Sequence, residues 1–168
     1  MNVAMLVARL IVGLGIAAHG SQKLFGWFHG PGLKGTAGWL ESLGYRPGII
    51  YALGSGLSEL IGGVLVALGL LNRIGPGLVI LVMLVAILTV HIGNGFFNEN
   101  KGWELPGVYI AAALAFDFAG FGAYSLDKVF GFPFFSLQTR WIILGAAVVL
   151  ALLIFSTRRR KGSPAAAV

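Results

Sequence analysis

Cysteine is absent from the 168 residues of this chain, and charged residues are scarce. Without a thiol, the chain cannot form a disulfide, carry out thiol redox chemistry, or ligate zinc or an ordinary iron–sulfur cluster through sulfur. Charged residues make up 11% of the sequence, whereas a typical soluble domain is about a quarter charged. The hydrophobic fraction is 57%. This composition indicates an integral membrane protein of one domain's length.

The charges that remain are mostly basic, and several of them gather near the C-terminus. The formal net charge is +6, and four of the twelve basic residues form the Arg-Arg-Arg-Lys run at 158–161. We interpret this run as a membrane-surface anchor and expect no nucleic-acid partner, because the interleaved aromatic and basic residues of a nucleic-acid groove are missing. The positive-inside rule then predicts a cytoplasmic C-terminus. Arg9, the first basic residue, lies inside the first apolar run, which favours a retained helix over a cleaved signal peptide.

Five apolar segments suit membrane-spanning helices, which need about 20 residues each. They cover residues 3–25, 48–71, 74–92, 105–121 and 141–155. The fifth segment is shorter than the first three, but it is uniformly apolar. We therefore predict an all-α membrane protein, built as a four-helix transmembrane bundle plus a fifth C-terminal transmembrane helix.

The spans and their connections predict three parts of the chain. These are a four-helix domain over 1–130, an aromatic connection with the fifth helix over 131–157, and a basic, mobile tail over 158–168. The connection 27–47 is expected to be a loop whose Trp39 lies at the headgroup level. After the fourth span, Ser125 and Asp127 are expected to cap or turn the chain.

Small residues recur every four positions in the first two spans, and such ridges let membrane helices approach closely. The ridges are Gly13 and Ala17; Gly54, Ser58 and Gly62; and Ser55, Glu59 and Gly63. They predict tight helix packing, with Glu59 held inside the bundle.

Charged and polar groups inside a span are costly, so each one is a candidate for function. The first and third spans run in the same direction, and His19 and His91 each lie near the end of one of them. Lys23 follows His19 by one helical turn, and Glu104 enters the fourth span from the same membrane face. These four residues are predicted to form one polar layer.

A second set of charges is expected deeper in the bundle. The helical rise places Arg9, Glu59 and Asp117 roughly 17 to 21 Å from the face that carries Lys23. At similar depths, the arginine and the two carboxylates are predicted to form a structural ion-pair cluster that offsets the cost of burying charge.

Each of these residues also has a simpler interpretation. The ion-pair cluster is compatible with a purely structural role, because buried charges need partners in any protein. His19 and His91 can serve as interfacial hydrogen-bonding groups, and Lys23 can extend its amine to the headgroups. Two histidines on parallel helices also suit haem or a metal, but only residue type and depth match, so we predict no metal site and disfavour haem.

The residues assembled above, in this order, resemble the DoxX family of membrane proteins over about residues 3–130. The matching positions are Arg9; His19, Gly20 and Lys23; Glu59, Gly62 and Gly63; Gly69 and Arg73; His91; Gly102 to Pro106; and Tyr124 to Asp127. The fifth span and the basic tail exceed the four-helix core that is usual in this family.

The resemblance implies a multi-pass protein of a bacterial-type plasma membrane that is linked to quinone-dependent respiratory or sulfur-redox complexes. Some relatives look like the DoxD-type large subunit of thiosulfate:quinone oxidoreductase. The chain is then expected to be a membrane subunit that binds quinone through His19, Lys23 and His91 and does not catalyse a reaction alone. His19, Glu59, His91 and Glu104 would exchange protons with the quinone. The alternative is a non-enzymatic accessory or assembly subunit that docks on a larger complex.

Overall fold

The computed structural model describes residues 2–133 and 135–159, and this part of the chain is helical with no strands. Its α-helices are α1 Asn2–Phe25, α2 Gly32–Ser42, α3 Gly48–Leu68, α4 Ile74–Ala86, α5 Glu104–Ala119, α6 Leu126–Phe130 and α7 Leu137–Ser156. A π-helical turn, Ile87–His91, extends α4, and short 3₁₀ turns occupy Trp27–His29, Ile92–Asn94 and Asn98–Asn100. The predicted all-α membrane bundle is confirmed.

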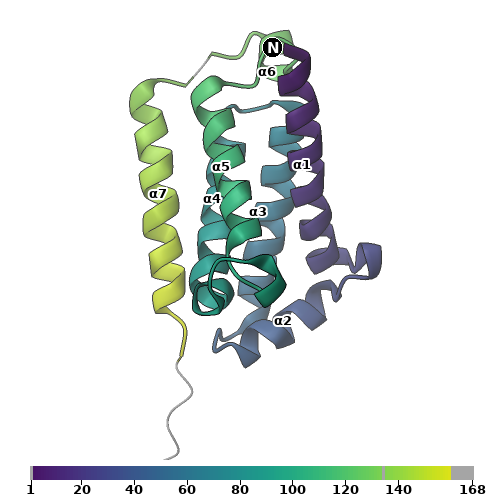
Figure 1. Ribbon diagram of the computed structural model, residues 1–168, viewed down its shortest axis with the longest axis vertical. Helices are drawn as coiled ribbons and strands as arrows, with labels where there is room; N and C mark the ends of the chain where they lie inside the picture. Colours follow the sequence, from purple (N-terminus) through teal and green to yellow (C-terminus); the bar gives the residue numbers. More distant parts are fainter. Residues whose placement is uncertain (1, 134, 160–168) are drawn as a thin grey trace, which may run out of the picture.

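Five helices, α1, α3, α4, α5 and α7, lie side by side along the long axis of the molecule and alternate in direction (Figure 1). The N-terminus and α6 lie at one end, which we call the arginine end because it holds Arg9 and Arg73. The helix α2 lies at the other end, which we call the pocket end because His19 and His91 lie there. The chain therefore begins at the arginine end, and α7 finishes at the pocket end.

Among the described residues, four helical segments are long and apolar enough to cross a membrane. They are Asn2–Phe25, Gly48–Leu68, Ile74–Asn94 and Leu137–Ser156. The helix α5 has 16 residues, or about 24 Å of axial rise, which is shorter than the hydrocarbon core of a bilayer. It packs along α4 in the bundle, but the predicted fourth span is not among these four segments.

Helices α1 and α3 pack backbone to backbone through glycine. A Cβ atom on Gly13 would lie 2.6 Å from the carbonyl oxygen of Gly63, and one on Gly20 would lie 2.7 Å from that of Gly56. Real Cβ atoms do not approach so closely, so only glycine permits this helix spacing. The predicted tight packing through Gly13 and Gly63 is confirmed.

The ridge through Gly54 has a different environment from the one predicted. A Cβ atom on Gly54 would meet nothing within 4 Å, whereas Gly62 faces α4 beside Leu78. Gly54 and Ser58 instead line a cavity. Four-residue spacing identifies one face of a helix, but it does not distinguish a packed neighbour from open space.

The connection 27–47 is not a simple loop, because it contains α2. Leu33, Ala37 and Leu40 recur at helical spacing, and the last two are buried against Tyr45 and Ala52. This amphipathic pattern is typical of a helix lying across the end of a bundle.

Ser125 and Asp127 fold as predicted. The Ser125 hydroxyl accepts a hydrogen bond from the backbone N–H of Lys128 and caps α6. The Asp127 carboxylate accepts two backbone N–H groups, from Leu71 at 2.8 Å and Asn72 at 2.9 Å. The segment after α5 is thereby fastened to the turn between α3 and α4.

At the opposite end, Arg158 donates hydrogen bonds to the carbonyl oxygens of Leu43 and Thr89. The start of the predicted basic tail therefore contacts the pocket end of the bundle. Residues 160–168, with the rest of the predicted membrane anchor, lie outside the described part of the chain.

Candidate functional site

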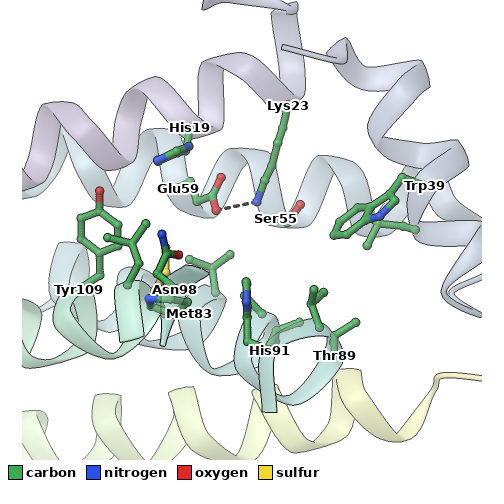
Figure 2. Close-up of a pocket in the computed structure, with 17 residues that line it drawn as sticks. His19, Lys23, Trp39, Ser55, Glu59, Met83, Thr89, His91, Asn98 and Tyr109 are labelled. Carbon is green, nitrogen blue, oxygen red and sulfur yellow. Dashed lines mark hydrogen bonds and ion pairs between the residues drawn. The ribbon is translucent and has the colours of Figure 1, made fainter. Parts of the chain in front are cut away.

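A cavity of about 270 Å³ opens at the pocket end, between α1, α3, α4 and α5. Figure 2 shows its polar side chains facing a common space, and among them are His19, Lys23, Glu59 and His91. Most of the remaining wall is apolar, including Met83 from α4. Three of the four residues of the predicted polar layer thus meet here, and Glu59 joins them.

Lys23 and Glu59 form an ion pair inside this cavity. The Lys23 Nζ atom lies 2.6 Å from Glu59 Oε1, with 26% of the lysine side chain and 5% of the glutamate side chain exposed. The second carboxylate oxygen, Oε2, is buried and has no hydrogen-bond partner among the described residues. A buried acceptor without a partner is uncommon in proteins, so Oε2 is a place where a ligand can donate a hydrogen bond.

The pairing follows from helix geometry. Side chains on an α-helix lean toward its N-terminus. Lys23 stands near the end of α1 and therefore leans into the bundle, whereas Glu59 on the antiparallel α3 leans toward the pocket end. The lysine does not extend to the headgroups, because its amine turns inward to the carboxylate.

His19 stands one turn before Lys23 on α1. Its Nδ1 lies 3.1 Å from Gln22 Oε1, and the Gln22 amide nitrogen donates to the Phe28 carbonyl oxygen. Because the amide nitrogen is used in that bond, Oε1 accepts from His19 Nδ1, which therefore carries a hydrogen. In a neutral imidazole, Nε2 is then the acceptor.

His91 lies at the end of the π-helical turn that extends α4. Its Nδ1 lies 2.6 Å from the carbonyl oxygen of Lys101. A carbonyl oxygen only accepts, so Nδ1 donates, and Nε2 is again the acceptor of the neutral ring. Short π-helical segments inside α-helices occur frequently at functional sites.

Glu104 does not line the cavity. Its Oε2 accepts the backbone N–H of Asn98 at 2.9 Å, and Asn98 itself belongs to the cavity wall. The predicted fourth member of the polar layer thus shapes the connection before α5 and stands behind the wall.

Several polar and aromatic side chains of the wall are not among the predicted site residues: Trp39, Ser55, Thr89, Asn98 and Tyr109. Ser55 precedes Glu59 by one turn on the predicted ridge of small residues, so the four-residue spacing could have identified Ser55 as a wall residue. Trp39 lines the cavity and is half exposed, and its position depends on the helix α2, which replaces a predicted loop.

The predicted cluster of Arg9, Glu59 and Asp117 does not form, which corrects the sequence-based assignment. Glu59 pairs with Lys23 at the pocket end. Arg9 is fully buried at the other end, where it donates to the Tyr124 carbonyl oxygen at 2.9 Å.

Asp117 pairs with two other arginines at the arginine end. Its Oδ1 lies 3.4 Å from Arg73 Nη1, and its Oδ2 lies 3.0 Å from Arg140 Nε. Arg73 and Asp117 each have only 2% of the side chain exposed. The three predicted members are thus divided between two separate sites.

The register of α1 against α3 explains the error. Gly20 lies against Gly56 and Leu60, so each step along α1 matches a step back along α3. Glu59 is therefore level with His19, and Arg9 is level with Gly69, against which its guanidinium packs. The predicted depths assume that α3 begins level with Lys23, whereas its first residue, Gly48, lies beyond that level.

Among the described residues, no three histidine, cysteine or acidic side chains converge as a metal site would require. The described polar groups of the cavity are instead suited to an organic ligand with oxygen atoms, because they combine an ammonium, a carboxylate and two imidazoles.

Comparisons with known proteins agree with the resemblance seen in the sequence. The sequence model of the DoxX family matches residues 4–92. An "Uncharacterized protein" of Haemophilus influenzae is 35% identical over 107 residues, which cover 58% of this chain and 80% of that protein. A Bacillus subtilis protein named "Putative oxidoreductase CatD" is 34% identical over 100 residues, which cover 60% of this chain and 69% of that protein. No solved structure matches significantly. The chain belongs to the DoxX family.

Proposed function

We propose that this chain is the membrane subunit of a quinone-linked oxidoreductase and that the cavity at the pocket end binds the quinone ring. The observation that carries the proposal is the buried Oε2 of Glu59, an acceptor without a described partner in a largely apolar cavity that also contains Lys23 and two histidines. The reduced form, a quinol, has the matching character, because its flat body is apolar and its hydroxyl groups can donate to an unpartnered carboxylate oxygen.

Both imidazoles use Nδ1 in a hydrogen bond within the protein, so Nε2 of each ring is left to contact the ligand in its oxidised (quinone) or reduced (quinol) form. When protonated, the ring donates from Nε2 to a quinone oxygen; when neutral, Nε2 accepts from a quinol hydroxyl. Glu59 Oε2 accepts the hydrogen of a quinol hydroxyl, and Lys23 holds Oε1 in place. Glu104, behind Asn98, connects the wall of the cavity to the exposed connection before α5.

Reduction of a quinone to its quinol consumes two electrons and two protons. The residues of this chain donate and accept the protons, and a partner protein with its own redox group supplies the electrons. Membership of the DoxX family and the name of the Bacillus relative associate the chain with redox chemistry in a membrane.

We also propose that the pocket end faces the cytoplasm of a bacterial-type plasma membrane. Short connections on the cytoplasmic side carry an excess of lysine and arginine. The basic residues near this end are Lys34 in α2, Arg46 and Lys101 in connections, and Arg158 and Arg159 after α7. Those near the other end are Arg73, Lys128 in α6 and Arg140 in the first turn of α7. Cysteine-accessibility labelling of Lys34→Cys and Lys128→Cys in intact cells tests this orientation.

The test of function is gentle purification from native membranes, followed by mass spectrometry of partner proteins and of extracted lipophilic molecules. We expect a quinone and an oxidoreductase partner with the wild type, and loss of the quinone with Glu59→Gln. His29→Asn is the matched control for histidine variants, because His29 is exposed and outside the cavity. A stable complex that retains no quinone would contradict the proposal and favour the accessory role.

A further inference from the structure

A second cavity, of about 340 Å³, adjoins the first. Leu40, Ser55, Val82 and Val85 line both, so the two spaces share a wall formed by α2, α3 and α4. The second cavity extends from this wall toward α7, where Ile154 lines it.

The second cavity differs in chemistry from the first, because none of the described residues that line it is charged. Its tyrosine hydroxyls are already paired: Tyr45 with Thr89 at 2.7 Å and Tyr51 with Thr157 at 2.8 Å. The Ser55 hydroxyl donates to the carbonyl oxygen of Ala52 in its own helix. These three hydroxyls need no polar ligand, and apart from the Ser58 hydroxyl the other described lining residues are apolar, so the cavity suits hydrocarbon.

We infer that the second cavity holds the first part of the isoprenoid tail of the quinone whose ring lies in the first cavity. This inference rests on the proposed function. An apolar cavity of about 150 Å³ accommodates benzene. A cavity of 340 Å³ therefore has room for about two isoprene units, after which the tail leaves the protein for the lipid.

The charges favour a quinone over a phospholipid as the occupant. A phospholipid would bring a phosphate to the first cavity, where the cation Lys23 is already neutralised by Glu59 at 2.6 Å. The carboxylate would repel the phosphate, whereas it accepts a hydrogen bond from a quinol. A single tail also fits one cavity better than two acyl chains do.

Gly54 provides the test, because it lines the second cavity and has open space where a side chain would be. Gly54→Leu fills the second cavity and leaves the polar residues of the first, Lys23, Glu59 and the two histidines, unchanged. Gly145→Leu is the matched control: it makes the same change in a long apolar helix, at a position with open space that lines neither cavity. Ser58→Leu, on the same wall, is a second blocking variant if Gly54→Leu does not purify as a single species.

The experiment measures the binding of two probes to the purified full chain in detergent. The quenching of tryptophan fluorescence reports the binding of each probe. One probe is a dimethoxy-benzoquinone without a tail, and the other is the same ring with two isoprene units; both are used in their reduced, quinol forms. Comparing variant with wild type for each probe removes the effect of probe partition into the micelle. Trp39 lines the first cavity, so the part of the quenching that is lost in a Trp39→Phe variant is the signal from that cavity.

We expect Gly54→Leu to weaken binding of the tailed probe by about tenfold and to leave the tailless probe within about twofold of wild type. The control should change neither. Equal affinities of wild type and both blocking variants for the tailed probe would overturn the tail site while leaving the proposed function intact. If neither probe shows Glu59-dependent binding to the wild type, the proposed function and the tail site are both wrong.

Discussion

At the arginine end, the buried charges are held by other groups of the protein. Asp117 lies against Arg73 and Arg140, and the carboxylate of Asp127 accepts two backbone amides. At the pocket end, Lys23 and Glu59 also pair with each other, but the pair lines a cavity, and one oxygen of Glu59 has no described partner. The difference separates charges that fasten helices and turns together from charges that remain available to a ligand.

Arg9 shows that a missing hydrogen bond alone does not mark a ligand site. Its Nε and Nη1 atoms also lack described partners. However, its guanidinium packs against Gly69 and lies 5.7 Å from the ring centroid of Phe121, and it lines none of the cavities described above. The cavity beside Glu59 is therefore the decisive part of the comparison.

The largest effect is expected from Asp117→Ala at the arginine end. This change removes a carboxylate that pairs with the buried Arg73, and breaking a buried ion pair from one side costs about 3–5 kcal/mol. We expect a much lower unfolding temperature in detergent, measured by size-exclusion chromatography after heating. Glu99→Ala, at an exposed acidic residue, should change little. Equal unfolding temperatures for the two variants would show that the arginine end does not depend on this pair.

The next largest effect on stability is expected from a change in the close contact between α1 and α3. Gly20→Ala places a methyl group against the α3 backbone, and such overpacking costs about 1–3 kcal/mol. Gly54→Ala is the matched control, because its methyl group meets open space. We expect the unfolding temperature to fall for Gly20→Ala alone. Without a clash, alanine in a helix is slightly stabilising, because it restricts the unfolded chain. A fall of the same size for Gly54→Ala would therefore show that the effect of Gly20→Ala does not come from its contact with α3.

Counting residues along the spans was enough to predict the five long helices, though not α2, and the convergence of His19, Lys23 and His91. All three lie near helix ends, so the direction of each span determines which face they share. Glu59 and Arg9 lie farther along their helices, where depth depends on the register between two helices. That register is set by the contact of Gly20 with Gly56 and Leu60, which no single span reveals.

Side-chain length is the second limit on what the sequence predicts. Arg9 leans toward the N-terminus of α1 and reaches Tyr124, a residue 115 positions away in the chain. Arg73 and Arg140 reach Asp117 from the start of α4 and from α7. Such pairings depend on how the helices are arranged around the bundle axis, and hydropathy and spacing do not specify that arrangement.

Glu59→Gln sharpens the comparison by neutralising the carboxylate at the pocket end with little change of shape. We expect affinity for a tailless benzoquinone in its reduced form to fall about tenfold, or about 1.4 kcal/mol. Because the Lys23 side chain is 26% exposed, it can turn toward solvent, and the unfolding temperature should fall less than for Asp117→Ala. A large loss of stability with unchanged affinity would make the Lys23–Glu59 pair structural, like that of Arg73 and Asp117.

The smallest effect is expected from His91→Asn. Asparagine keeps a donor near the position of Nδ1, which holds the Lys101 carbonyl oxygen, but it removes Nε2. One hydrogen bond to the ligand contributes about 0.5–1.5 kcal/mol, so the affinity for the reduced benzoquinone should fall severalfold. Fluorescence titration measures this change, with His29→Asn as the control that should bind like wild type.

The outcome for His91 decides whether the two sides of the cavity act together. If binding weakens, a group on the π-helical turn after α4 and the carboxylate on α3 contact the same ligand, and the cavity is a single site. If binding is unchanged while the unfolding temperature falls, His91 only fastens the connection that contains Lys101. The ligand would then be held by α1 and α3 alone, and the π-helical turn would serve the fold.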